Sequence, residues 1–302
     1  MATLKGQNLR LMALDDQEHW VCVGMSTNLV ATLTGNTEDA SHKDVVGNSS
    51  LPTIVSKAWS AQVDSLDVTD MVTLLNAVKT FKKFRLLWDE TSTVDNVQPL
   101  KANFSRQGDA YINDATFTFN DRENSTKNIS FIGASPLTAG DAVDYASPTI
   151  TGLTKGQFIR LFLGSDNTAT PSRVVAFARQ LSFHVSVQME SASTKDTEGN
   201  FDIQEPVGLS YDISSSALVR NGESITSSVQ GQTLNDLETI YENALPVKYE
   251  IANVSGANNR TKGSVLVSGS VVLTSLTLNA PNRQTATYDC QMQGYGNYLL
   301  PT

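Results

Sequence analysis

An internal repeat is the feature of this sequence that most constrains its fold. The segment Lys-Gly-Gln-Asn-Leu-Arg-Leu at residues 5–11 recurs as Lys-Gly-Gln-Phe-Ile-Arg-Leu at residues 155–161, with five identities in seven. Residues 38–44 match residues 190–196 at an offset of 152, and the same offset places Trp59 opposite Tyr211. Self-similarity at a long, fixed period is the sequence signature of repeated structural units. The sequence therefore predicts a tandem duplication.

Each half of the chain contains one segment with helical periodicity. Apolar side chains recur every three or four residues over residues 68–78 and again over residues 234–244, as on the buried face of an amphipathic helix. Asp67 and Thr233 stand at the expected N-cap positions, each with an aspartate three residues later, where the helix dipole favours a carboxylate. We expect one helix in each half.

The remaining patterned segments are typical of β-strands. Residues 84–88 and 247–251 are short and rich in aromatic or branched side chains. Residues 108–119 align with residues 263–274 at an offset of 155, and both segments predict a strand, a tight bend and a second strand. Each half then ends in an extended segment, which covers residues 129–133 or 286–294.

Polar segments between these elements predict loops. Long polar loops are expected at residues 37–56 and 189–207, where short connections are the rule. Residues 219–232 are an insert that only the second half has, whereas residues 89–105 form a longer loop in the first half. These differences indicate that the two copies have diverged.

The order of elements predicts the domain organisation. Mostly antiparallel strands with one covering helix fit a small β-sandwich or barrel. Residues 135–154 are small, polar and rich in proline and glycine, which is typical of a linker. The predicted fold class is mainly β, with two similar β-sandwich or barrel domains that each have one flanking helix. The expected boundaries are residues 1–134 for the first copy and residues 155–302 for the second.

Charge argues against specific DNA binding. The 302 residues include 22 Lys+Arg and 31 Asp+Glu, which gives a net charge of −9. Divided after residue 154, the two halves carry −6 and −3. A protein that holds DNA needs a basic surface to displace phosphate counterions. The one basic cluster, residues 79–85, fits the end of a helix and the start of a strand. We expect no specific nucleic-acid contact and, without a long apolar segment or leader, no membrane insertion.

The residues that could carry catalysis or bind metal do not form a recognisable site. His42, Lys43 and Asp44 are consecutive and so do not converge on one substrate atom, and the residue aligned with His42 is Thr194. There is no Gly-x-Ser-x-Gly motif, and Cys22 and Cys290 lie in apolar or β-type segments. The aspartates lack the spacing of a calcium loop, and three histidines do not form a zinc motif. The sequence predicts no catalytic, metal or cofactor site.

Several segments of the second half resemble the tail tube, or major tail, proteins of long-tailed, non-contractile phages. The similarity covers most of residues 155–298, and the first half is a degraded version of it. The segments that carry it are Ser-Thr-Lys-Asp-Thr-Glu-Gly at 193–199, Glu-Pro-Val-Gly-Leu-Ser-Tyr-Asp at 205–212, Thr-Leu-Asn-Asp-Leu at 233–237, Leu-Thr-Leu-Asn-Ala-Pro-Asn at 276–282 and Ala-Thr-Tyr at 286–288.

The resemblance implies a function as well as a fold. Tail tube domains assemble into stacked rings, usually of six domains, around a lumen through which genome DNA passes into a bacterial host. The resemblance therefore implies a structural virion protein located in the tail, made and assembled in the host cytoplasm, with other tail proteins at the tube ends. If one chain supplies two of six domains, three chains close a ring with pseudo-sixfold symmetry. Six chains per ring, with one domain on the exterior, is the alternative. The acidic balance predicts a net negative inner wall.

Candidate contact residues follow from comparing the two long loops. Lys43-Asp44 and Lys195-Asp196 are a charged pair kept at the same place in both loops, and Glu205 lies beside the second. Charge pairs in loops fix register between copies, so these five residues are candidate subunit or ring-to-ring contacts. A solvated turn is the alternative interpretation. At the level of the whole protein, a capsid decoration or receptor-binding β module of a virion has the same composition and stays open.

Overall fold

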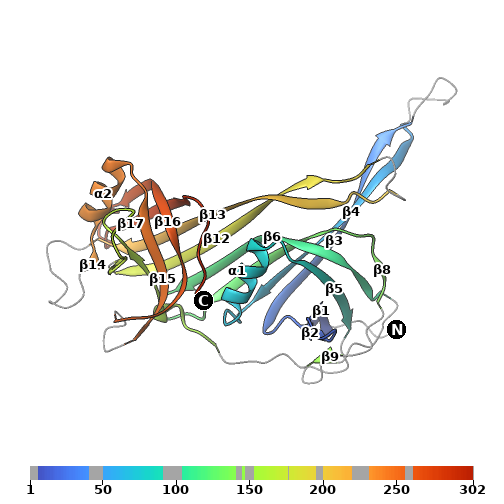
Figure 1. Ribbon diagram of the computed structural model, residues 1–302, viewed down its shortest axis with the longest axis horizontal. Helices are drawn as coiled ribbons and strands as arrows, with labels where there is room; N and C mark the ends of the chain where they lie inside the picture. The colour runs from blue at the N-terminus through green and yellow to red at the C-terminus, as the bar shows by residue number, and fades with distance from the viewer. Residues whose placement is uncertain are drawn as a thin grey trace.

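A computed structural model describes residues 6–40, 50–90, 104–140, 145–146, 153–175, 177–194, 200–219, 231–255 and 261–301 of the chain. The described residues are mainly β, with one α-helix in each half of the chain. The expected fold class is therefore confirmed. In Figure 1, most of the C-terminal half (yellow to red) lies beside the N-terminal half (blue to green), and its yellow β12–β13 hairpin extends over the N-terminal half.

The first half contains nine strands and one α-helix among the described residues. In chain order, these elements are the short helix η1 (Gly6–Asn8), β1 (Leu9–Leu14), β2 (Trp20–Cys22), β3 (Ser26–Asp39), β4 (Pro52–Ser65), α1 (Met71–Lys79), β5 (Lys83–Glu90), β6 (Arg106–Asn120), β7 (Thr126–Gly133), β8 (Thr138–Ala139) and β9 (Tyr145–Ala146). The last two strands fall in the segment expected to be a linker, where β8 pairs with β6 and β9 pairs with β2.

Apart from an additional short strand, β14, and from β8 and β9, which have no counterpart, the second half repeats this order of elements. It contains η2 (Gly156–Phe158), β10 (Ile159–Leu163), β11 (Arg173–Val175), β12 (Ala178–Ser191), β13 (Gln204–Leu218), β14 (Gly231–Gln232), α2 (Leu234–Asn243), β15 (Val247–Ser255), β16 (Thr261–Asn279) and β17 (Thr287–Gly294). Hydrogen-bonded neighbours follow the order β2-β1-β5-β6-β7-β4-β3 in the first half. They follow β11-β10-β15-β16-β17-β13-β12 in the second half, which is the same order.

The strand registers of the two halves also correspond. The β3–β4 pair shifts register at positions 26/28 and 36/37, and the β12–β13 pair shifts at positions 178/180 and 188/189, a constant offset of 152. The β6–β7 pair shifts between Ile112 and Asp114, and the β16–β17 pair shifts between Leu273 and Ser275, a constant offset of 161. Bulges add one unpaired residue at a defined place. Their recurrence shows that the equivalent strands correspond residue by residue.

The core of each half forms where the curled sheet closes on itself. Trp59 of β4 packs edge-on against Trp88 of β5, with ring centroids 5.6 Å apart, although β6 and β7 separate these strands in the sheet. In the second half, the ring of Tyr211 on β13 lies 5.9 Å from that of Tyr249 on β15, whose position matches Leu86 and not Trp88. These aromatic rings join the two layers of each sandwich, and their prediction as equivalent strand anchors agrees with the structure.

Glycines on neighbouring strands make room for these rings. A Cβ on Gly133 would lie 2.4 Å from the Trp59 ring, and a Cβ on Gly294 would lie 2.5 Å from the Tyr211 ring. Gly108 and Gly269 face the same two rings and are also related by the offset of 161. The expected match of position 108 with position 263 is therefore wrong, because the strand register follows the glycines under the rings.

Two further expectations about strands are wrong. Residues 108–119 and 263–274 do not form a strand, a bend and a strand, because each lies within one long bulged strand, β6 or β16. The polar segments expected to be long loops begin and end in paired strands, and residues 41–49 and 195–199 within them lie outside the described residues. Pairing continues to Asp39 opposite Pro52 in the first hairpin and to Ser191 opposite Gln204 in the second.

The two helices begin differently. Thr233 caps α2 as expected, with its backbone N–H and its hydroxyl both donating to Asp236, at 2.8 and 2.9 Å. In the first half the N-cap is Asp70 and not Asp67, whose carboxylate instead accepts bonds from the backbone and hydroxyl of Thr69. The carboxylate of Asp70 makes no capping hydrogen bond and instead binds the buried ammonium of Lys127 at 2.6 Å.

Candidate self-association surface

The two halves are joined edge to edge by an antiparallel strand pair, which we call the inner seam. Residues Asp114–Asn120 of β6 pair with Gln180–Ser186 of β12, with Phe117 opposite Phe183. β7 occupies the other edge of β6, so β12 lies on the same edge as β5 and continues the sheet where β5 ends. The inner seam therefore makes one hydrogen-bonded sheet from both halves.

One face of the inner seam is dry. Three alternate residues of β6 and three of β12 are at most 3 % exposed, and these are Ala115, Phe117, Phe119, Leu181, Phe183 and Val185. Helix α1 of the first half extends this contact to the C-terminus, because the Tyr298 hydroxyl donates to the Leu75 carbonyl at 2.6 Å. Each large buried aromatic or aliphatic side chain contributes about 1.5–3 kcal/mol. The inner seam is thus built like a protein core.

The opposite face of the inner seam holds a histidine between two carboxylates. His184 of β12 lies 2.6 Å from Asp114 of β6 and 2.9 Å from Asp212 of β13, one contact through each ring nitrogen. The hydrogen bond to Asp114, together with the negative charge of both aspartates, raises the pKa of His184 to about 9 against the opposing effect of burial. The protonated imidazole therefore bridges the two halves at neutral pH.

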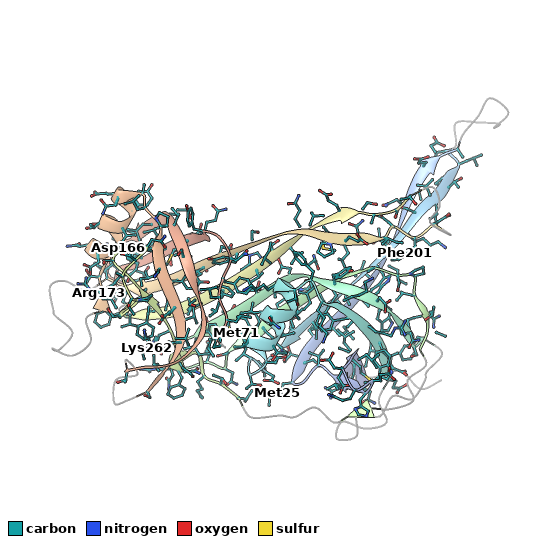
Figure 2. All side chains as sticks on the ribbon, in the orientation of Figure 1. Met25, Met71, Asp166, Arg173, Phe201 and Lys262 are labelled. Atoms are coloured by element: carbon teal, nitrogen blue, oxygen red, sulfur yellow. The ribbon has the colours of Figure 1, made fainter. Side chains whose placement is uncertain are left out.

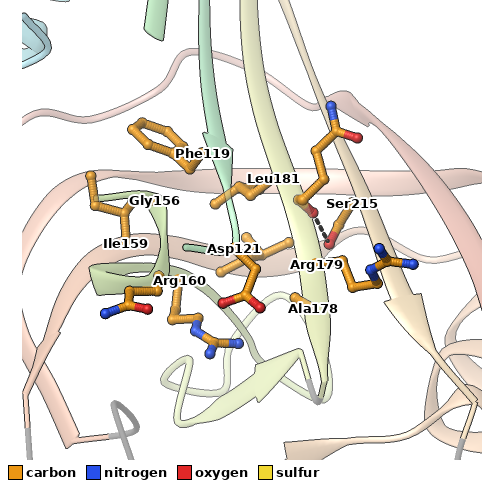
Figure 3. A pocket seen from close by; sticks show the side chains of 12 residues that line it. Phe119, Asp121, Gly156, Ile159, Arg160, Ala178, Arg179, Leu181 and Ser215 are labelled. Atoms are coloured by element: carbon orange, nitrogen blue, oxygen red, sulfur yellow. Dashed lines mark hydrogen bonds between the residues drawn. The ribbon is translucent and has the colours of Figure 1, made fainter. Parts of the chain in front are cut away.

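A tight contact at the end of the inner seam is shown in Figure 3. Gly156 of η2 lies against the end of β6, and a Cβ at this position would be 2.4 Å from the backbone of Asn120. The backbone N–H of Gly156 donates to the Glu123 carbonyl, and that of Asp121 donates to the Arg179 carbonyl. Gly156 belongs to the repeated Lys-Gly-Gln segment. This packing explains why one of the two copies of the segment needs a glycine at this position.

The β12–β13 hairpin forms a second contact between the halves. It crosses over the first half and reaches the β3–β4 hairpin, where Phe201 lies beside β4 (Figures 1 and 2). The Lys57 N–H donates to the Asn200 carbonyl at 2.5 Å, and the Asp202 N–H donates to the Lys57 carbonyl at 2.9 Å. Phe201 is 9 % exposed. The far end of one hairpin is thus docked on the other.

The two strand edges that correspond to the two sides of the inner seam have no strand partner among the described residues. β3 pairs only with β4, so its outer edge is open. β16 pairs with β15 only as far as Val271, so the same edge of β16 is open from Val272 to Asn279. Open edges present unpaired N–H and C=O groups and are templates for strand addition. We call these edges the free edge of β3 and the free edge of β16.

Eight strands form a continuous sheet between the two free edges, and one face of it is polar. Its order is β3-β4-β7-β6-β12-β13-β17-β16. Residues paired across neighbouring strands share a face. The resulting, mostly polar face contains Asn28, Thr32, Thr34, Ser60, Gln62, Asp64, Asn128, Ser130, Asp114, Thr116, Thr118, Ser182, His184, Ser186, Asp212, Ser214, Ser216, Asp289, Gln291, Gln293, Ser275, Thr277 and Asn279, together with the less polar Val30, Ala58, Tyr111, Ile132 and Val272. These positions include four aspartates and neither lysine nor arginine.

The contact residues predicted from the sequence fall mostly outside the described residues. Lys43, Asp44, Lys195 and Asp196 all lie outside them, as does most of the expected insert. Glu205 lies on β13, is exposed, and pairs with Glu190. The expected role of the charged pairs in subunit contacts therefore stays a prediction.

The sequence does not predict the residues of the inner seam. Asp114, His184 and Asp212 are far apart in the sequence, and only the strand registers bring them together. The available signal is the repeat itself, because residues that differ between aligned copies, such as His184 and Thr32, mark places where the copies have different surroundings.

The cysteines and the other potential ligands do not form a reactive site in the described part of the chain. Among the described residues, no cluster of three or more potential metal ligands occurs, and no helix is long and apolar enough to cross a membrane. Cys22 and Cys290 are buried thiols, and burial raises the pKa of Cys22 to about 11 and that of Cys290 to about 12. These values argue against either thiol as a nucleophile at neutral pH.

Comparison with known proteins gives distant structural matches. No protein-family model matches the sequence, and no curated protein matches it significantly. A chain from the tail of an empty gene transfer agent particle with C6 symmetry matches with a TM-score of 0.35 and 13 % identity, over 48 % of this chain and 95 % of that chain. A chain of the native gene transfer agent virion matches with a TM-score of 0.37 and 12 % identity, over 49 % and 99 %. The SPP1 tail tube matches with a TM-score of 0.35 and 14 % identity, over 47 % and 75 %. Over about half of its length, the chain is similar in structure to tail tube and gene transfer agent chains.

Proposed function

We propose that this chain is a structural virion protein that assembles with copies of itself into stacked rings, which form the tail tube of a long-tailed phage. The observation that supports this most directly is the inner seam between equivalent halves. At the two ends of the same sheet, the free edges of β3 and β16 correspond to the β12 and β6 sides of that seam. A contact that joins unlike edges of equivalent units repeats head to tail, and such contacts close into rings when the rotation allows. The sequence resemblance supplies the tail tube assignment.

The proposed ring contains three chains. The halves correspond to residues 1–134 and 155–302 of a duplicated tube domain, joined by residues 135–154, so three chains supply six domains with pseudo-sixfold symmetry. The agreement of strand order and bulges supports equivalent positions around one ring. A ring of six chains with one domain on the exterior would leave the inner seam without an equivalent elsewhere in the ring.

The polar face is the proposed wall of the lumen through which DNA passes. Three eight-stranded sheets closed into a barrel, with strands about 4.8 Å apart and tilted by about 35–45°, have a backbone diameter of roughly 45–52 Å. That is wide enough for a DNA duplex. Four aspartates against one protonated histidine leave this face net negative, which repels phosphate, and a wall without lysine or arginine does not hold DNA by counterion release. DNA is thus expected to slide without specific binding, and no catalytic role is assigned.

The same proposal accounts for the stacking of the rings and for the location of the protein in the virion. In the sequence, Lys43, Asp44, Lys195 and Asp196 fall between the paired strands of the two hairpins, with Glu205 close to the second pair. We assign these residues to ring-to-ring contacts. The protein is then assembled in the host cytoplasm, resides in the virion tail, and meets other tail proteins only at the ends of the tube.

Mass measurement of the assembled species tests the stoichiometry. The purified chain, alone and in the presence of tail initiators, is examined by negative-stain microscopy for rings or tubes, and isolated rings are weighed by native mass spectrometry. The trimer predicts a ring with three times the chain mass of 32.6 kDa. A ring with six times the chain mass would exclude the trimer. A discrete oligomer that never forms rings or tubes would favour a decoration or receptor-binding module instead.

A further inference from the structure

We infer that the free edge of β3 in one chain pairs antiparallel with the free edge of β16 in a second copy, in the register already present at the inner seam. In this outer seam, Val30–Thr34 lies beside Ser275–Asn279, with Thr32 opposite Thr277. The inference rests on the proposed ring and adds to it the strands, the register and the residue pairs of the contact between chains.

The register follows from the equivalence of the strands. β12 corresponds to β3 at an offset of 152, and β6 corresponds to β16 at an offset of 161, as their bulges show. At the inner seam, His184 is opposite Thr116 and Val185 is opposite Ala115. Applying the two offsets converts these pairs into Thr32 with Thr277 and Leu33 with Leu276. No freedom in the register remains after this step.

Residues of the outer seam are exposed in a single chain, whereas the equivalent residues of the inner seam are buried. Leu33 is 71 % exposed, whereas its equivalent Val185 is fully buried. Leu278 is 54 % exposed, whereas its equivalent Phe117 is fully buried. Both exposed leucines lie on the side of the sheet that is dry at the inner seam. Another strand that covered this face would bury both leucines, which would explain why these positions are apolar.

Two more positions of the inner seam have uncovered equivalents. Tyr241 of α2 aligns with the buried Leu75 of α1 and is 49 % exposed. A Cβ on Gly6 would meet no atom within 4 Å, although its equivalent Gly156 is pressed against the end of β6. The glycine that both Lys-Gly-Gln segments share is thus required by packing at only one of its two positions in the single chain.

A second copy is the occupant that fits both edges. The two open edges are unlike, lie at opposite ends of one sheet, and carry the two complementary sides of a seam that the chain already forms internally. The residues at the outer seam equivalent to His184 and Asp114 are Thr32 and Ser275, so no charged side chain is buried at these two places when the edges meet. Another protein would have to reproduce β16 to make the same contacts.

Disulfide trapping tests the register. The double variant Thr32→Cys/Thr277→Cys places two cysteines directly opposite each other, at Cα distances of about 4.5–5.5 Å, which a disulfide can span. The double variant Thr34→Cys/Thr277→Cys is the matched control, because it reports a register slipped by two positions. The variant Thr118→Cys/Ser182→Cys, across the inner seam, forms its disulfide within one chain and calibrates the oxidation. The native Cys22 and Cys290 are buried and do not compete.

The expected result is covalently linked chains from the first variant and not from the second, when rings are oxidised and run on a non-reducing gel. Rings that form but are linked only by the slipped pair, or by neither pair, would overturn the register while leaving the proposed function intact. Failure of the wild-type chain to form rings or tubes would count against the proposed function itself.

A charge substitution gives a second, independent readout. Leu278→Lys adds a charge to a side chain that is already exposed in the single chain, so we expect an unchanged melting temperature and a loss of rings. Leu153→Lys changes a comparably exposed leucine, 48 % exposed and outside both seams. It is expected to leave rings intact. Normal rings from the Leu278→Lys variant, measured by the same native mass spectrometry, would contradict the outer seam.

Discussion

Single residues at the inner seam combine structural and electrostatic roles. His184 is one-third exposed, yet both of its ring nitrogens contact carboxylates, one from each half of the chain. A protonated imidazole satisfies both carboxylates, whereas a neutral imidazole donates only one N–H. The electrostatic contribution to the link between the halves therefore depends on the protonation of one side chain.

Stability should fall as the pH rises through the pKa of His184. The folded pKa of about 9 lies above the ordinary value of 6.5, so the contribution is fully present below about pH 6.5 and is lost by about pH 9. After allowance for solvent screening, we expect about 1–2 kcal/mol. Urea unfolding from about pH 6 to 9.5 measures it, and His184→Gln should flatten the slope. Equal slopes in both proteins would refute this assignment.

At the scale of elements, the long β-hairpins differ most from the loops that the sequence predicts. Most of β3 is exposed on both faces, and so are the far ends of β4, β12 and β13. The β12–β13 hairpin is nevertheless fixed at its end by Phe201 and by backbone bonds to Lys57. Such a contact holds a thin element that has no core of its own.

Removing the aromatic anchor should loosen this contact without unfolding the protein. In Phe201→Ser, the lost burial of about 1.5–3 kcal/mol should speed hydrogen exchange of the Lys57 and Asp202 amides by roughly ten- to a hundredfold. Val207→Ser, at a half-exposed position of the same hairpin, is the control and should leave both rates unchanged. Unchanged exchange in the Phe201 variant would mean that the backbone bonds alone hold the hairpin.

The elements that the sequence predicts correctly are those with strong burial patterns. Helix α2 and strand β15 follow from apolar periodicity, because one face of each is buried. Strand β5 follows from its run of aromatic and branched side chains, which is buried on both faces. The sequence predicts loops for the hairpins because strands exposed on both faces show no alternation. Asp67 is a good cap by sequence, but its carboxylate accepts bonds from Thr69, and the first helix starts after Asp70, which binds Lys127 of a distant strand. Contacts set by strand register, such as His184 with Asp114, have no local signal.

At the scale of the whole molecule, the two copies of the repeat differ in which of their equivalent surfaces are buried within the chain. The same fold, with the same bulges, occurs twice, but only one of the two equivalent seams is closed within a chain, as far as the described residues show. The repeated glycines record this difference, because Gly156 is in tight contact and Gly6 has no atom near its missing Cβ.

Alanine at the two glycines should therefore have different effects. Gly156→Ala forces a Cβ into the Asn120 backbone and should lower the free energy of unfolding by about 1–3 kcal/mol. Gly6→Ala should change it by less than about 0.5 kcal/mol, since nothing lies near it in the single chain, but should reduce the yield of rings. Denaturant unfolding and native mass spectrometry measure the two effects. Full ring yield from the Gly6→Ala variant would show that this glycine does not take part in the outer seam.

The inner seam also affects how assembly depends on concentration. Bringing free molecules together costs translational and rotational freedom, estimated at about 4–15 kcal/mol for each association. Because folding of one chain already closes one seam, a ring of three chains needs two associations between molecules, where six separate domains would need five. The equilibrium yield of rings then rises with the third power of free subunit concentration and not with the sixth. A two-domain subunit can therefore start a tube while its copies are still scarce.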